Sequence, residues 1–170
     1  VLMQADRLGG ENKHAAIVSD CYDYVMNYLP AAEIPYRGRE DDGGKVVYDC
    51  YHTGFVLRSM LKISNHTRKE NVPFVVDKTR IMLNDFVCDG VVTAFKNKRY
   101  FDIHALAEYI ATYADFHGFL NEKERDEIDE IVGRSIAFYI SKKNRGTYIY
   151  KSNGGHVIDE YMPRWGHAAM

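Results

Sequence analysis

The sequence predicts a mainly α-helical fold of repeated α-hairpins, part of an α/α toroid, in which a short β-hairpin precedes each inner helix. Stretches with one apolar face alternate with stretches that are apolar almost all round, as expected for an outer and an inner ring of helices. The aromatic residue of the first strand of each predicted hairpin recurs at Tyr36, Phe95 and Tyr150, which indicates a stacked array. An open α-solenoid is the competing architecture.

Two helices are expected at the beginning of the chain. Residues 1–8 have the pattern of the last turns of a helix that ends at Gly9 and Gly10, because glycine is common just past a helix end. A second helix is expected over 11–29, where apolar residues recur at helical spacing up to Pro30. A short extended piece and an acidic turn follow, within 34–47.

The middle of the chain contains two predicted inner helices and one outer helix. The inner helices are expected over 49–63 and 102–116, because both segments are apolar over most of their circumference. Between them, residues 67–87 have one apolar face, and a capping-box pattern starts at Thr67. Residues 91–100 are expected to form a hairpin that turns at 96–98.

The last part repeats this order of elements. A second capping pattern, Asn121 with Glu124, begins an amphipathic helix that reaches about residue 142. Residues 147–158 are expected to form a further hairpin, and another inner helix begins at Pro163. We therefore expect a single domain over 1–170 that holds about half of a six-hairpin ring. Flanking sequence or another copy of the chain would cover its open side, since soluble proteins avoid a large exposed apolar face.

The predicted inner helices all begin with polar residues, and the ring would bring these helix starts to one end. The positive ends of the helix dipoles favour carboxylates and anionic ligands there. The residues concerned are Asp49, Tyr51 and His52 at the first start, Asp102 and His104 at the second, and Arg164, Trp165 and His167 at the third.

Two kinds of role are open for these residues. Asp49 and Asp102 are either N-caps or general acid/base groups, since Asp is a favoured cap and paired carboxylates catalyse glycoside hydrolysis. His52 and His104 either bond to a neighbour within the fold or transfer protons. The candidates for holding a substrate, by stacking on a sugar or by pairing with a carboxylate, are Tyr51, Arg164, Trp165 and His167.

Composition narrows the class of protein. A net charge of −2 and 46% hydrophobic residues predict a globular protein that does not bind nucleic acid. No apolar run approaches the roughly 18 to 20 residues of a membrane helix, and we expect a cytoplasmic location without membrane binding. The three cysteines lack metal-ligand spacing, so we expect buried, reduced thiols. Neither a metal nor a cofactor is expected, because the chain has no ligand signature and no phosphate-binding loop.

The helix starts resemble a known family. Three segments are similar, in order and spacing, to the signatures of bacterial six-hairpin glycosidase-like proteins: YDCYHTGFVL from Tyr48, FDIHA from Phe101 and PRWGHA from Pro163. These are α/α-toroid proteins that are often encoded beside polysaccharide-biosynthesis genes. Two residues depart from the family pattern, since Cys50 stands where Asn is usual and His167 where Gln is usual. Both departures are expected to fall on cavity residues.

The resemblance implies a carbohydrate-related protein whose site lies at the starts of the inner helices. The family includes hydrolases, lyases, epimerases and members without known activity, so the reaction stays open. We expect a carbohydrate ligand and, if the protein is an enzyme, glycosidase-like catalysis by Asp49, His52, Asp102 and His104. The alternative is a non-catalytic helical-repeat module that binds a glycan or a protein through the same face.

Overall fold

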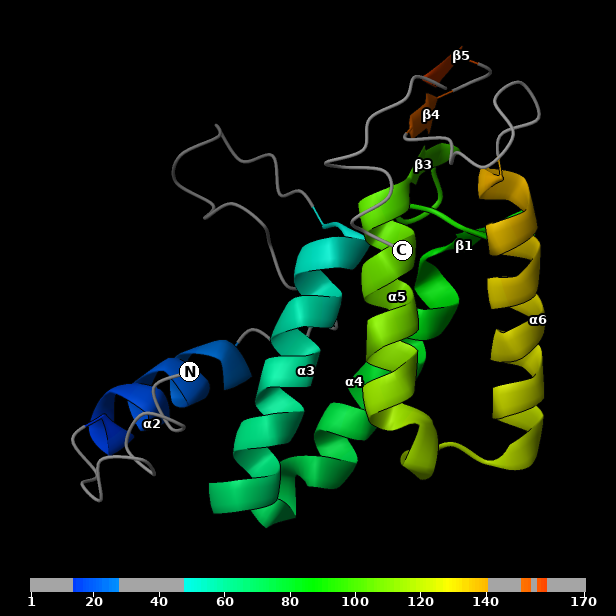
Figure 1. The fold of residues 1–170 in the computed structure, drawn as a ribbon. Coiled ribbons are helices and arrows are strands. Elements are labelled where there is room, and N and C mark those ends of the chain that lie inside the picture. Colours follow the sequence, from blue (N-terminus) through cyan, green and yellow to red (C-terminus); the bar gives the residue numbers. More distant parts are fainter. Residues whose placement is uncertain (1–13, 28–47, 141–150, 154–155, 159–170) are drawn as a thin grey trace. The chain divides into compact units, whose positions relative to one another are not determined.

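The computed structural model describes residues 14–27, 48–140, 151–153 and 156–158 (Figure 1). The chain divides into two compact units, Val1–Ile34 and Pro35–Met170, which are treated one at a time. Most of the described residues are helical, so the prediction of a mainly α fold is confirmed. A single domain over 1–170 stays a prediction.

The first unit contributes one described helix, α2 (Ala15–Met26), which lies within the predicted range of 11–29. Its Cys21 is exposed, which corrects the expectation of three buried thiols, although Cys50 is buried and Cys88 half-buried. Successive helical side chains point about 100° apart, and in α2 it is the neighbouring Tyr22 that is buried. All three thiols are free.

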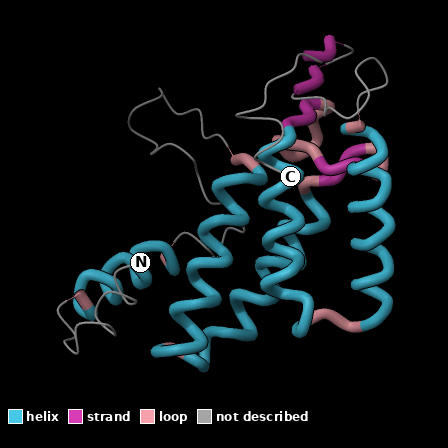
Figure 2. The backbone as a smooth tube through the Cα atoms, viewed as in Figure 1, coloured by secondary structure: helices cyan, strands magenta, loops and turns pink. Residues whose placement is uncertain are grey.

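The second unit is built on two antiparallel helical hairpins (Figures 1 and 2). In the first, α3 (Cys50–Thr67) is followed by a 3-10 turn, η2 (Lys69–Asn71), and by α4 (Val72–Asp85). In the second, α5 (Ile103–Phe116) is followed by η3 (His117–Phe119) and by α6 (Glu122–Tyr139). Helices α3 and α5 lie side by side and run in the same direction, and α5 also contacts α4 and α6. Helix α5 is therefore the centre of the unit.

The two predicted inner helices differ in how completely they are buried. Within α5 only Ala114 is exposed, as expected for an inner helix. The same expectation is wrong for α3, because Tyr51 and Phe55 are 44% and 57% exposed. These two residues lie one turn apart and share a face. Helix α3 thus packs on α4 and α5 on one side and keeps an apolar face exposed on another.

Short strands connect the helical hairpins. Strands β1 (Val87–Cys88) and β2 (Val91–Val92) pair antiparallel around Asp89 and Gly90, which both have positive φ, 53° and 75°. An Asp-Gly pair with positive φ at both residues favours a two-residue hairpin turn. The chain also folds back where a hairpin is predicted over 91–100, with the Ala94 N–H donating to the Tyr100 carbonyl, but β2 pairs with β1 there and not with the strand that begins at Tyr100. Strand β3 (Tyr100–Asp102) pairs with β4 (Lys151–Asn153) and β4 with β5 (His156–Ile158), all antiparallel.

One of the two predicted capping boxes is present. The Asn121 side chain accepts the Glu124 N–H at 3.0 Å, and the Glu124 carboxylate accepts the Asn121 N–H at 2.8 Å. The box predicted at Thr67 is wrong, because Thr67 ends α3 and its hydroxyl donates to the Ile63 carbonyl at 3.0 Å. A Thr near a helix end can satisfy its hydroxyl on the preceding turn instead of starting a new helix.

Gly54 lets α3 and α5 approach closely. A Cβ at this position would lie 2.6 Å from Thr112 Oγ1 and 2.9 Å from Glu108 Cγ, both on α5. One turn further along α3, Arg58 donates from Nη1 to Glu108 at 3.0 Å and from Nε to Asp115 at 2.7 Å. Because Glu108 is only 8% exposed, this ion pair is largely screened from water. The two helices are thus held by a close backbone approach and a partly buried charge network.

We expect the substitution Gly54→Ala to destabilise the fold by about 1–3 kcal/mol, because the added methyl group overpacks the interface between α3 and α5. The matched control is Gly133→Ala on α6, where an added Cβ meets nothing within 4 Å. There the better helix propensity of alanine should stabilise the fold by roughly 0.5–1 kcal/mol. Urea unfolding followed by circular dichroism measures both, and stabilisation by Gly54→Ala would contradict the close approach.

The charge network gives a second expectation for stability. The substitution Arg58→Met leaves Glu108 buried without its cationic partner and should cost roughly 2–4 kcal/mol of unfolding free energy. The exposed pair of Lys123 with Glu127, at 3.7 Å on α6, is the control. There Lys123→Met should cost less than about 1 kcal/mol. Equal losses in the two variants, measured by urea unfolding, would show that the pairing of Arg58 adds nothing beyond a surface contact.

Candidate functional site

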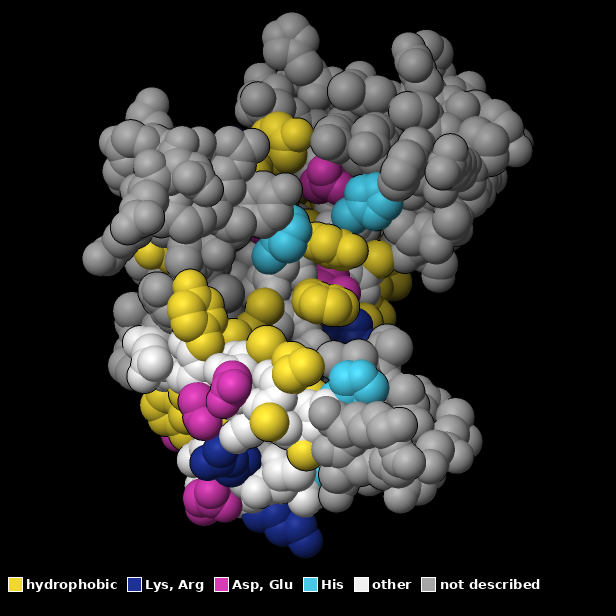
Figure 3. Space-filling view, turned by 90° about the vertical axis from the view of Figure 1, so that its left-hand side faces the viewer, with side chains coloured by type: hydrophobic (Ala, Val, Ile, Leu, Met, Phe, Trp, Pro, Cys, Tyr) yellow, Lys and Arg dark blue, Asp and Glu magenta, His cyan; other side chains and the backbone are white. Residues whose placement is uncertain are grey.

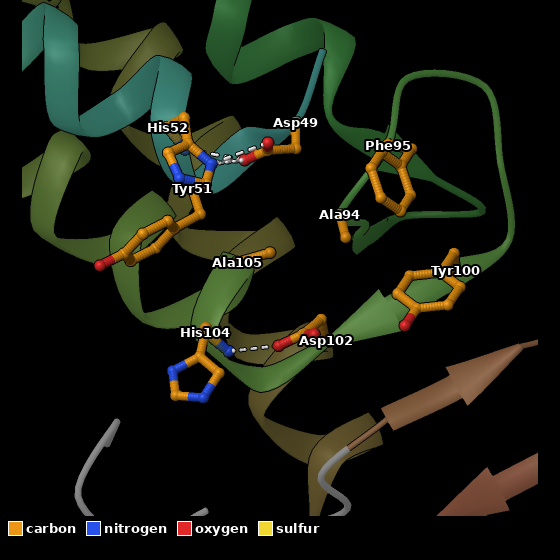
Figure 4. Close-up of a pocket in the computed structure, with 9 residues that line it drawn as sticks. All are labelled: Asp49, Tyr51, His52, Ala94, Phe95, Tyr100, Asp102, His104 and Ala105. Carbon is orange, nitrogen blue, oxygen red and sulfur yellow. Dashed lines mark hydrogen bonds and ion pairs between the residues drawn. The ribbon is translucent and has the colours of Figure 1, made fainter. Parts of the chain in front are cut away.

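The starts of α3 and α5 line one pocket of about 390 Å³. Figure 4 shows the two helix starts on one side of it and the chain between β2 and β3 on the other. In Figure 3, histidine, acidic and hydrophobic side chains lie next to one another on the face turned to the viewer. All five residues predicted at the first two helix starts are among the lining residues, which are Asp49, Tyr51, His52, Ala94, Phe95, Tyr100, Asp102, His104 and Ala105.

Asp49 is both the N-cap of α3 and a partner of the His52 ring. Its backbone is extended (φ −131°, ψ 156°), and its Oδ1 accepts the His52 backbone N–H at 2.8 Å. The imidazole Nδ1 lies 2.9 Å from Oδ1 and 2.8 Å from Oδ2 of the same carboxylate. Since an ionised carboxylate only accepts, Nδ1 carries the proton, and the lone pair of the neutral ring lies on Nε2. This is the arrangement in which a carboxylate orients a histidine base.

Asp102 caps α5 in a similar way. Its side chain accepts the His104 backbone N–H at 2.9 Å, while its own backbone is extended as the last residue of β3. The N-capping role is therefore present at both helix starts. Figure 4 shows a bonded carboxylate and imidazole at the first start and a carboxylate bonded to a backbone N–H at the second.

The far wall of the pocket is the loop between β2 and β3. The Thr93 hydroxyl lies inside this loop, 2.5 Å from the Lys98 carbonyl and 2.8 Å from the Tyr100 carbonyl. The Ala94 N–H also donates to the Tyr100 carbonyl, at 2.8 Å. These bonds hold the Phe95 and Tyr100 rings against each other, with centroids 5.2 Å apart. The result is an aromatic wall opposite the two helix starts.

Residues 92–94 link this wall to the helices. The Val92 N–H donates to the Ser135 hydroxyl of α6 at 2.9 Å, and the Ala94 carbonyl accepts the Cys50 N–H at the start of α3 at 2.9 Å. The wall is thereby fixed to both α6 and α3. A rigid wall suits a ligand site, because a pre-formed pocket loses less conformational freedom on binding.

Cys50 is not a cavity residue, which corrects the expectation from the family pattern. Its side chain is fully buried, and the thiol donates to the Ala105 carbonyl at 3.5 Å, behind the pocket. Burial, together with the negative charges of Asp49 and Glu108, raises the pKa of the Cys50 thiol well above its ordinary value. The thiol therefore stays protonated and does not serve as a nucleophile.

A buried tyrosine lies behind the second helix start. The hydroxyl of Tyr139 approaches the backbone of Asp102 without reaching hydrogen-bond geometry. Burial raises its pKa, and the nearby carboxylate of Asp102 raises it further. Tyr139 is thus a protonated support for the start of α5 rather than a base.

Several predicted features lie outside the described residues. These are Arg164, Trp165 and His167 of the third helix start, the helix predicted at 1–8, and the aromatic positions Tyr36 and Tyr150. Within the described part of the chain, no group of three or more potential ligands could hold a metal ion. No described helix combines the length and the apolar character that spanning a membrane requires.

Sequence reasoning missed the aromatic wall of the site. The sequence pattern marks Phe95 as a position of the repeat and places Tyr100 at the end of a predicted hairpin, but it predicts neither residue in the pocket. Their position in the sequence could have indicated this, because both residues lie shortly before Asp102, where the chain must fold back to begin α5. What the sequence did not indicate is that Thr93 closes the loop on itself.

The N-capping role of Asp49 and Asp102 can be tested by its effect on stability. Replacing Asp49 or Asp102 by Ala should cost about 0.5–2 kcal/mol of unfolding free energy, whereas replacement by Asn, an equally good cap, should cost much less. Urea unfolding of the four variants measures this difference. If the Ala variants are as stable as the Asn variants, the carboxylates do not stabilise the helix starts.

Comparisons with protein-family models, with curated proteins and with solved structures found no match. The resemblance to six-hairpin glycosidase-like proteins therefore stays a prediction from three short segments. The pocket, with its two capped helix starts and its aromatic wall, is the feature from which a function can be inferred.

Proposed function

We propose that this chain binds a carbohydrate in the pocket between the starts of α3 and α5, and that His52, oriented by Asp49, is its acid/base group. One observation carries the proposal: a single pocket joins a carboxylate-bonded histidine to three aromatic side chains, those of Tyr51, Phe95 and Tyr100. Aromatic rings with polar neighbours suit sugars, which present an apolar ring face and a rim of hydroxyl groups.

The size and lining of the pocket support a small ligand. Its volume of about 390 Å³ falls at the lower end of the roughly 300–1,000 Å³ of ligand sites. Tyr51, which is 44% exposed, stands edge-on to the His52 ring with centroids 5.0 Å apart. A sugar that stacks on the wall of Phe95 and Tyr100 would therefore meet the His52 imidazole on its other side.

The chemistry proposed for His52 follows from its bond to Asp49. The carboxylate holds Nδ1–H and stabilises the imidazolium form that a proton transfer would create. A histidine with this support can take a proton from a sugar hydroxyl or from water and return it to a leaving group. In this proposal Asp49 positions His52, and Asp102 at the start of α5 is a second carboxylate in the pocket.

We also infer that the two helical hairpins belong to a larger α/α array. The parallel pair α3 and α5, with α4 and α6 packed beside them, has the alternation of such a repeat. The exposed Tyr51 and Phe55 of α3 form the face that a further hairpin would cover. A toroid of this kind is the architecture that the family resemblance implies.

A second candidate function is non-catalytic binding of a glycan or a protein through the same face. It is favoured by the bonds of both aspartates, since each accepts a helix N–H and so has a sufficient structural role. In this version the pocket recognises a ligand without turning it over. The two candidates make the same prediction for binding and differ in turnover.

Binding should depend on the aromatic wall. With methyl glycosides of neutral sugars as probes, Tyr100→Ala should weaken binding about 2- to 12-fold, the scale of one aromatic contact of 0.5–1.5 kcal/mol. The control is Phe119→Ala, which removes an exposed aromatic residue (39%) outside the pocket. NMR titration measures both, and equal affinities in the Tyr100 and Phe119 variants would remove the aromatic wall from the proposal.

Turnover distinguishes the two candidate functions. If the protein is an enzyme, His52→Gln should bind neutral glycosides nearly as well as the wild type but release product about 10²- to 10⁴-fold more slowly. The measurement is product release from a panel of oligosaccharides and aryl glycosides. A wild-type protein that binds these probes and releases nothing would instead support the binding module.

A further inference from the structure

One side of α3 carries an exposed stripe of two aromatic residues and one basic residue. Tyr51 and Phe55 are 44% and 57% exposed, and the side chain of Lys62 is 67% exposed. Because successive helical residues point about 100° apart, these three residues share the side of α3 that lies opposite the buried Leu57. Exposed apolar side chains that adjoin charged ones mark surfaces that contact other proteins.

A complementary stripe runs along α6. Its exposed residues on the side opposite the buried Ile128 are acidic in the first half of the helix, at Glu122 and Asp126, and small in the second half, at Gly133 and Ala137. A Cβ added at Gly133 would meet nothing within 4 Å, so a bulky side chain from outside can approach the backbone there. The α6 stripe thus offers room for an aromatic ring and, further along the helix, negative charge.

The two stripes lie on opposite sides of the second unit. Helix α5 lies between α3 and α6 and contacts both, while each stripe is on the exposed side of its own helix (Figure 1). The start of α3 and the end of α6 are at the same end of the unit, because α3 runs with α5 and α6 runs against it (Figure 1). A second copy displaced sideways, without rotation, would bring its α3 stripe against the α6 stripe of the first copy, with the two helices antiparallel.

The two stripes also match in their spacing. On α3, Phe55 and Lys62 follow Tyr51 by four and by eleven residues, and on α6 the corresponding positions precede Ala137 by four and by eleven residues. At 1.5 Å per residue these steps are roughly 6 Å and 16.5 Å on both helices. In an antiparallel contact each aromatic residue therefore lies opposite a small residue, and the lysine lies opposite an aspartate. The pairs are Tyr51 with Ala137, Phe55 with Gly133, and Lys62 with Asp126.

Each of these pairs favours contact for a physical reason. An aromatic ring opposite a glycine or an alanine packs against the helix backbone and removes apolar surface from water. Lys62 lies 3.7 Å from Asp115 of its own chain, and its exposure also lets it attract a carboxylate of another copy. Charge complementarity of this kind fixes the register of an interface more than it adds affinity.

We propose that copies of this chain associate head to tail, with the α3 stripe of one copy packed on the α6 stripe of the next. Contact between two different surfaces does not close after two copies, so it continues into a row of copies. The second copy would supply the helical hairpin that covers Tyr51 and Phe55, as expected for an array of α-hairpins. The association goes beyond carbohydrate binding and can fail or hold independently of it.

Sedimentation of the whole chain at concentrations up to about 1 mM tests the association, because a contact between single helices buries less than a standard interface and is weak. The average mass should rise with concentration beyond that of two chains. Phe55→Lys should weaken the association at least about tenfold, the scale of one aromatic anchor. The control is Ile81→Lys on α4, which changes a 40% exposed residue outside both stripes and should associate like the wild type.

A mixture of two variants tests the head-to-tail geometry. Phe55→Lys blocks the α3 stripe, and Gly133→Leu blocks the α6 stripe by filling the room opposite Phe55. Each variant alone should be a monomer with unchanged helical circular dichroism. Mixed in equal amounts, the two variants retain one intact stripe each and should form a dimer that does not grow further.

A charge exchange tests the register. Lys62→Glu and Asp126→Lys should each weaken the association about 3- to 10-fold, because each places like charges opposite one another. The double variant restores an opposite-charge pair in reversed order and should associate within about twofold of the wild type. A double variant that is weaker than both single variants would contradict the pairing of Lys62 with Asp126.

The remaining outcomes separate the possible occupants of the α3 stripe. A wild-type chain that stays monomeric at about 1 mM would overturn the proposal and leave the stripe to the chain itself or to a different protein. A wild-type dimer that does not grow with concentration would overturn the head-to-tail contact in favour of a symmetric one. Glycoside binding is measured separately, so neither outcome affects the proposed function.

Discussion

The close approach of α3 to α5 at Gly54 is the constraint on which the site depends. Gly54 lies just over one turn into α3, and the residues that it meets, Glu108 and Thr112, lie in the second and third turns of α5. Because the two helices run in the same direction, this contact keeps their starts at the same end of the unit (Figure 1). A larger residue at position 54 would meet Thr112 and Glu108, so the two helices would separate where the pocket begins. The pocket between Asp49 and Asp102 therefore depends on the packing of α3 against α5 at Gly54.

The same interface explains why a charged cluster can lie partly buried. Arg58 on α3 donates to two different carboxylates of α5, those of Glu108 and Asp115, and one side chain can reach both only when the two helices keep a fixed height and rotation. Apolar packing alone would allow the helices to slide, whereas these bonds favour one register. Residues 92–94 then tie α6 and the aromatic wall to the start of α3, so the pocket is bordered by elements that are each held from behind.

The sequence predicted helices better than it predicted strands, and the reason is the range of the interactions. The limits of α5 and α6 follow from local patterns, such as the Asn121 capping box, because each helix satisfies its own backbone. Strand β3 pairs with β4, and the two strands are separated in the sequence by the whole of α5 and α6. No local pattern encodes such a distant partner. Thr67 shows the limit of a local pattern, since its hydroxyl was satisfied by the preceding turn. In the site, the polar helix starts were predictable, whereas the loop closed by Thr93 was not.

The two aspartates show how a structural role can shape a functional one. An N-cap satisfies free N–H groups at a helix start and sits on the positive end of the dipole. Once Asp49 and Asp102 occupy those positions, the backbone N–H groups of His52 and His104 are bonded within the protein. At Asp49 the same carboxylate also reaches the His52 ring, so one side chain stabilises the start of α3 and, in the proposed function, orients a base.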